Sequence, residues 1–107
     1  MTSYGFHPGA LMDYEDATRY YLEQASPMVA AAFVAAVEAA IQAVCASPMT
    51  WRAVDELGVR RYLLRRFPYA LYYRWDEERD RVSIYAVMHL RRRPGYWRHR
   101  LRTSGDA

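Results

Sequence analysis

Three short runs of β-branched and aromatic residues, lying close together in the second half of the chain, constrain the fold most. They occupy residues 59–66, 69–75 and 81–90, and this composition is typical of β-strands. Only Phe67-Pro68 separates the first two runs, and only the acidic segment 76–80 separates the last two. A parallel pairing needs a crossover of a dozen or more residues, so connections this short require neighbouring strands to pair antiparallel. The sequence therefore predicts an antiparallel sheet.

The first half of the chain contains two helical patterns that meet at Ser26-Pro27. From residue 11 to 25, apolar positions recur at the spacing of an amphipathic helix. Ser26 is a good N-cap and Pro27 is favourable at the first helical position, so a second helix begins almost where the first ends. Its apolar stripe runs to about residue 46 and consists of Phe33, Val37, Ile41 and Val44. Because the joint is so short, the two helices are expected to fold back antiparallel.

The remaining segments complete the predicted order, β-α-α-β-β-β-α. A short strand over residues 2–6 precedes the first helix, residues 48–58 form a connecting loop, and a short helix follows Pro94. We expect the α+β class, with a mainly antiparallel sheet backed by a two-helix hairpin. The 107 residues suffice for one domain, over residues 1–102, with a flexible tail at 103–107.

Composition argues against several classes of protein. No stretch of about twenty uncharged apolar residues is present, because the Ala-rich segment 29–44 carries Glu38 and Gln42. Residues 1–7 lack the basic start and apolar run of a secretory signal, so we expect a cytoplasmic protein with no membrane association. The single cysteine, Cys45, excludes an internal disulfide, and the chain lacks the ligands of a zinc cluster. We expect no metal and no cofactor.

The basic residues are all arginine, and many lie on the predicted strands, although the formal net charge is only +3. Alternation along a strand places Arg61 and Arg65 on one face, with Tyr62 and Leu64 toward the helices. Along the last strand it places Val82, Ile84, Ala86 and Met88 on one side, and Ser83, Tyr85, Val87 and His89 on the other. The sequence predicts one cationic hollow, which His89 and Tyr85 join. The residues expected to bind nucleic acid or an acidic protein there are Arg61, Arg66, Arg74, Arg91, Arg92 and Arg93.

Ribonuclease chemistry is one interpretation of this surface. It requires a base for the 2′-hydroxyl proton, a cation for the developing phosphorane charge and an acid for the leaving oxygen. Histidine is the side chain whose ordinary pKa lies nearest neutrality, so His89 is the candidate acid or base. Arg65 or Arg61 is the candidate phosphate ligand, and Tyr96 the candidate proton donor or stacking ring. Alternatively, His89 only hydrogen-bonds a loop, and the acidic segment 76–80 is a solvated turn without the features of a calcium site.

Three segments carry a resemblance to a known family over about residues 4–100. They are FHPGALMDYEDATRYYLEQASP, VRRYLLRRFPYALYYR and YAVMHLRRRPGYW, in this order. The chain resembles the RelE/ParE family of toxins from type II toxin–antitoxin systems. The resemblance implies a curved antiparallel sheet backed by a helix hairpin, and a co-expressed antitoxin whose C-terminal segment wraps the toxin and keeps it inert.

Two modes of growth inhibition follow from this resemblance. RelE-like members cleave mRNA on the ribosome with basic residues of the sheet and a C-terminal His or Tyr; Arg65 or Arg66, His89 and Tyr96 occupy comparable places. ParE-like members bind DNA gyrase and trap its cleaved DNA complex without performing chemistry. The lysines of some RelE-like members are absent here. A third interpretation is a non-toxic remnant that acts as a basic nucleic-acid-binding module.

Overall fold

The computed structural model describes residues 2–92 and 95–102. The elements follow in the order β1 (Ser3–Phe6), α1 (Pro8–Gln24), α2 (Pro27–Ala46), β2 (Arg52–Ala53), β3 (Arg60–Leu63), β4 (Tyr69–Asp76), β5 (Arg81–His89) and the 3-10 helix η1 (Tyr96–Arg102). One five-stranded sheet has the order β1-β5-β4-β3-β2. β1 pairs parallel with β5, and the other neighbours pair antiparallel. The predicted α+β class, with a mainly antiparallel sheet and a helix hairpin, is confirmed.

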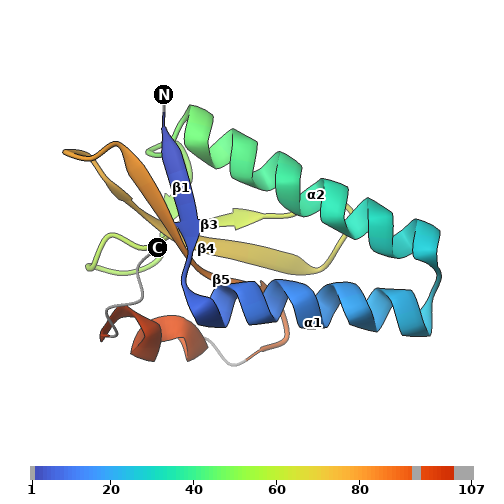
Figure 1. The fold of residues 1–107 in the computed structure, drawn as a ribbon. Coiled ribbons are helices and arrows are strands. Elements are labelled where there is room, and N and C mark those ends of the chain that lie inside the picture. Colours follow the sequence, from blue (N-terminus) through green and yellow to red (C-terminus); the bar gives the residue numbers. More distant parts are fainter. Residues whose placement is uncertain (1, 93–94, 103–107) are drawn as a thin grey trace.

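The helix hairpin begins and turns where local capping signals require it. The Nδ1 atom of His7 accepts a hydrogen bond from the Gly9 N–H at 2.9 Å, and the Ser26 hydroxyl accepts one from the Val29 N–H at 3.1 Å. In both helices a proline occupies the first turn, where no N–H is needed. Figure 1 shows α1 and α2 running antiparallel from a short common joint. These two caps therefore fix the residues at which α1 and α2 begin.

The main core lies between the helix hairpin and one face of the sheet. Phe33 of α2 is fully buried, and its ring centroid lies 5.1–5.3 Å from those of Tyr21, Phe67 and Tyr69. Leu64 belongs to this core, and Tyr62 packs against it, as alternation along β3 predicts. The core thus joins α1, α2 and the central strands around one aromatic cluster.

One described helix, α2, is long and apolar enough to cross a membrane by length and composition, with a mean hydropathy of 2.0. Its stripe of Phe33, Val37 and Ile41 is buried against the sheet and α1. A core helix of a folded domain has the same composition, so this feature is explained by packing.

The opposite face of the sheet is covered in part by the C-terminal segment. Trp97 of η1 is buried with Val59, Ala86 and Met88, and its ring stacks on that of Tyr72 at 5.4 Å and 30°. The helix expected beyond Pro94 is therefore present as a 3-10 helix that packs through Trp97. Pro94 itself and the expected tail at 103–107 lie outside the described residues.

Three features depart from the sequence expectation. The strand expected over residues 59–66 is shorter, Arg60–Leu63, so Arg65 and Arg66 lie in the turn that follows it. The segment 48–58, expected to be loop throughout, contributes Arg52–Ala53 as the edge strand β2. In β5, the register passes from Tyr72↔Ala86 to Tyr73↔Ile84, so Tyr85 is an extra residue in a β-bulge. A bulge reverses the alternation of side chains beyond it.

The faces predicted for the end of β5 are therefore wrong. Val82 and Ile84 face the helices as expected, but after the bulge Val87 also joins the main core, whereas Ala86 and Met88 lie on the opposite face. His89 pairs with Tyr69 and thus lies on the helix side of the sheet.

Candidate functional site

The arginines expected to form one hollow are divided among three. His89 and Arg92 line a hollow of about 250 Å³ beside α1, Arg61 and Arg65 line one of about 500 Å³ at the β3 edge, and Arg74 lines one of about 480 Å³ at the β4–β5 hairpin. The prediction of a single cationic hollow is wrong, because the β5 bulge turns His89 away from the face that carries Arg61.

The hollow around His89 contains carboxylates. Asp13 and Asp16 of α1 line it together with Tyr20, Tyr69 and Arg92. The His89 ring meets that of Tyr69 edge-on at 5.2 Å, and its Nδ1 atom accepts a hydrogen bond from the Arg91 N–H at 3.0 Å. Burial raises the pKa of the Tyr69 hydroxyl to about 12, so this phenol stays protonated near neutral pH. The loop contact considered for His89 from the sequence is therefore present.

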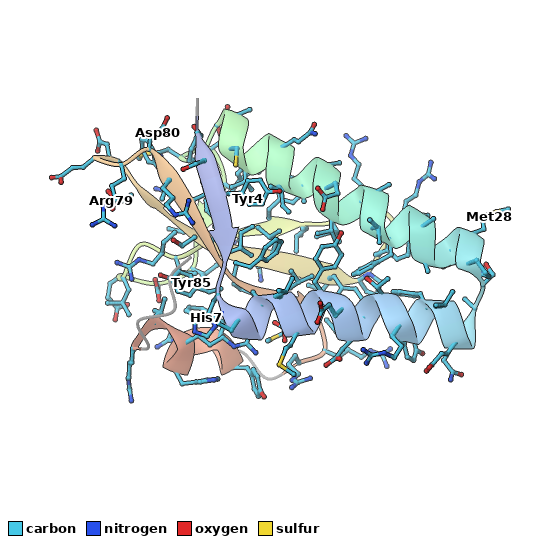
Figure 2. All side chains as sticks on the ribbon, viewed as in Figure 1. Tyr4, His7, Met28, Arg79, Asp80 and Tyr85 are labelled. Atoms are coloured by element: carbon cyan, nitrogen blue, oxygen red, sulfur yellow. The ribbon has the colours of Figure 1, made fainter. Side chains whose placement is uncertain are left out.

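The hollow at the β4–β5 hairpin has mixed charge. Three arginines and three acidic residues line it: Arg74, Arg79 and Arg81, and Asp76, Glu77 and Glu78. Figure 2 shows Arg79 and Asp80 at the outer end of this hairpin. Arg79 pairs with Asp76 at 3.7 Å. The local charges therefore nearly cancel, and this hollow is a weak anion site.

The other predicted site residues are spread along the chain. Arg66 is exposed in the β3–β4 turn with a φ of 69°, and Arg91 is exposed after β5. Tyr96 begins η1, and the Arg92 guanidinium carbon lies 4.3 Å from the centre of its ring. Arg93 lies outside the described residues. Of the proposed catalytic residues, Tyr96 is thus connected to the His89 hollow through Arg92, whereas Arg65 lines a different hollow.

A buried ion pair, which the sequence did not reveal, holds the C-terminal segment in place. Arg100 of η1 donates to Asp13 of α1 through Nη1 at 2.6 Å and Nη2 at 3.2 Å, and Nη1 also donates to the Tyr85 carbonyl at 2.9 Å. The same carboxylate accepts the Val87 N–H at 3.2 Å. A Cβ added at Gly9 would lie 2.6 Å from the Arg100 Nε atom. The cluster thus ties α1, the β5 bulge and η1 together.

Comparison with known proteins identifies the family. A family model described as the ParE toxin of the type II toxin–antitoxin system parDE matches residues 4–94. The chain belongs to the ParE toxin family. The search of curated proteins gives no match. Among solved structures, a chain from the chromosomal ParDE toxin–antitoxin system of P. aeruginosa is similar in fold, with a TM-score of 0.70 and 20% sequence identity over 83% of this chain and 96% of that one.

His7 caps the start of α1 in this ParE-family chain. His7 is buried, and Figure 2 shows it beside Tyr85, whose ring centroid lies 6.1 Å away. Burial lowers the pKa of His7, Arg100 and His99 lower it further, and Asp13 opposes them. The Nδ1 atom accepts the Gly9 N–H, so protonation there would also remove the helix cap.

We expect the free energy of unfolding to fall as the pH drops below about 6.5, the pKa of an unfolded histidine. The sign follows from the lowered pKa of folded His7: in that range the unfolded chain binds a proton that the folded chain does not. The measurement is urea unfolding at about pH 7.5 and about pH 5.5 for the wild type and His7→Asn, because Asn retains the cap acceptor and does not titrate. If the free energy of unfolding fell equally in the two proteins between these pH values, His7 would be excluded as the source of the pH dependence.

Proposed function

We propose that this chain is a growth-inhibiting toxin that acts in the cytoplasm by binding DNA gyrase, without cleaving RNA, and that a cognate antitoxin neutralises it. Membership of the ParE toxin family supports the toxin role, and the resemblance to ParE-like members supports gyrase as the target. The alternatives are ribosome-dependent mRNA cleavage and a non-toxic basic module that binds nucleic acid.

The observation that favours gyrase binding over RNA cleavage is the surroundings of His89. Asp13 and Asp16 line the same hollow, and among its lining residues the only arginine is Arg92. The arginines that pair with these two carboxylates, Arg100 and Arg19, are already engaged, so a phosphodiester that approached His89 would meet one guanidinium group beside two carboxylates. Arg65, the candidate phosphate ligand, lines the hollow at the β3 edge instead. A ribonuclease must place its base, its cation and its acid around one phosphate. His89 lines the hollow beside α1 and Arg65 lines the one at the β3 edge, so these two hollows do not bring the two residues around one phosphate.

Variants of the two candidate catalytic residues test this proposal. We expect His89→Ala and Arg65→Ala to arrest growth as strongly as the wild type when expressed without antitoxin. A ribonuclease would instead lose about 10²–10⁴-fold in rate on losing its general base. Growth arrest is measured from induction curves, and mRNA integrity from total RNA of the same cultures.

The gyrase arm uses purified protein. We expect the wild type to inhibit supercoiling by gyrase and to accumulate cleaved plasmid, with mRNA intact in the induced cells. Intact supercoiling together with fragmented mRNA would replace gyrase by RNA as the target. Expression without any growth arrest would favour the non-toxic module.

A further inference from the structure

The hollow at the β3 edge differs from the other two hollows that hold predicted site residues. Trp51, Arg52, Arg61, Tyr62, Leu63 and Arg65 line it, and no acidic side chain does. Its volume of about 500 Å³ lies within the range of about 300–1,000 Å³ that is usual for ligand pockets. Trp51 is brought to β3 by a hydrogen bond from Arg60 Nη1 to the Trp51 carbonyl at 2.7 Å. The site is therefore built from β2, β3, the residue that precedes β2 and the turn that follows β3.

The arginines of this hollow are arranged without counter-charges. Arg52 of β2 stands directly opposite Arg61 of β3 in the antiparallel register, an arrangement of like charges that destabilises a sheet. Among the described residues, none forms a hydrogen bond or ion pair with the side chain of Arg52, Arg61 or Arg65. An anion bound between the strands would relieve the repulsion and use the free guanidinium donors.

Aromatic rings supply the second feature of the hollow. The rings of Trp51 and Tyr62 meet edge-to-face, with centroids 4.7 Å apart and planes at 81°. The Trp51 Nε1–H is buried and has no hydrogen-bond partner among the described residues, which is costly for a donor.

We propose that this hollow binds single-stranded nucleic acid, with phosphates on Arg52, Arg61 and Arg65 and a base against the Trp51–Tyr62 pair. Unpaired bases stack on aromatic rings while arginines follow the backbone. An acidic peptide is the weaker candidate, because the edge strand β2 has only two residues and β3 offers only its Leu63 end beyond it, which leaves little main chain for a peptide strand to pair with. The inference goes beyond the proposed function and does not depend on gyrase as the target, so Arg65→Ala can weaken strand binding without changing growth arrest.

Binding is measured by fluorescence anisotropy of a labelled oligothymidylate of about 15 nucleotides with the purified full chain, in the absence of gyrase. Three phosphate contacts give a slope of log Kd against log salt of about 2, so raising salt from about 50 to about 200 mM weakens binding about 20-fold. We expect Arg52→Glu/Arg65→Glu to lower this slope by about 1.4 or more. Both residues are exposed, so the substitutions leave the core intact, which circular dichroism checks.

The matched control is Arg19→Glu/Arg79→Glu, which makes the same change of charge at two exposed residues outside the hollow. We expect its affinity and salt slope to stay close to those of the wild type. Equal weakening of the two double variants would overturn the site, because binding would then follow net charge alone. Trp51→Phe adds a local readout: we expect the quenching of tryptophan fluorescence by the oligonucleotide to be largely lost in this variant. Unchanged quenching would remove Trp51 from the site.

Two comparisons separate this inference from its alternatives. A duplex of the same length, or a polyglutamate peptide, that binds as tightly as the single strand would overturn the proposed ligand. Single-strand binding by a protein that does not inhibit gyrase would support the site and refute the proposed target. Gyrase inhibition without single-strand binding would support the proposed target and refute the site.

Discussion

Replacing Asp13 by Ala is expected to lower the free energy of unfolding by about 3–5 kcal/mol, the usual cost of leaving one partner of a buried ion pair unpaired. The Arg100 side chain is only 8% exposed and that of Asp13 17%. The carboxylate also accepts the Val87 N–H. Its loss therefore leaves the Arg100 guanidinium without a counter-charge and the Val87 N–H without its acceptor. Urea unfolding followed by circular dichroism measures the effect.

The control for Asp13 lies one helical turn away. Asp16 pairs with Arg19 at 3.2 Å, but these side chains are 65% and 61% exposed. Asp16→Ala is therefore expected to cost at most about 1 kcal/mol. The double variant Asp13→Leu/Arg100→Met should recover part of the loss, because apolar replacement of both partners removes the unpaired charge but restores no side-chain partner to the Val87 N–H or the Tyr85 carbonyl. Equal effects of Asp13→Ala and Asp16→Ala would refute the account of a buried ion pair.

Replacing Phe33 by Ala is expected to cost about 3–5 kcal/mol, the range for removing a buried aromatic side chain. Phe33 is fully buried, and four aromatic rings from α1, the β3–β4 turn and β4 surround it, those of Tyr14, Tyr21, Phe67 and Tyr69. Its removal leaves a cavity where both helices meet the sheet. The midpoint of urea unfolding should fall without a comparable change in slope.

Met28→Ala on the same helix is the matched control for Phe33. Met28 is 81% exposed, so we expect a change within about 0.5 kcal/mol. If Phe33→Ala lowered the free energy of unfolding as little as Met28→Ala, this aromatic cluster would not be what holds the helix hairpin on the sheet.

Local sequence patterns predicted most of the fold. The proline and N-cap at Ser26-Pro27 set the helix joint, and the composition of residues 69–75 and 81–90 set the central strands. These signals act over a few residues, so they can be seen without tertiary structure. Alternation along β3 also predicted correctly that Tyr62 and Leu64 face the helices. It succeeded there because the pairing of β3 with β4 contains no bulge.

The candidate site could be predicted only in part. Arg61 and Arg65 were expected on one surface and do line one hollow, but Trp51 and Arg52, which complete it, lay in a segment expected to be loop. A two-residue strand has too little pattern to be detected. Its position depends on pairing with β3, which is a tertiary contact.

By itself, the sequence determined the α+β class, the helix hairpin, the antiparallel central strands and the family, because each depends on short-range periodicity or on ordered motifs. Only the tertiary structure decided which arginines share a hollow and what holds η1. The bulge at Tyr85 turns His89 to the helix side, and Asp13 meets Arg100 across 87 positions of sequence. Both depend on strand register and on the packing of distant segments, which no local pattern records.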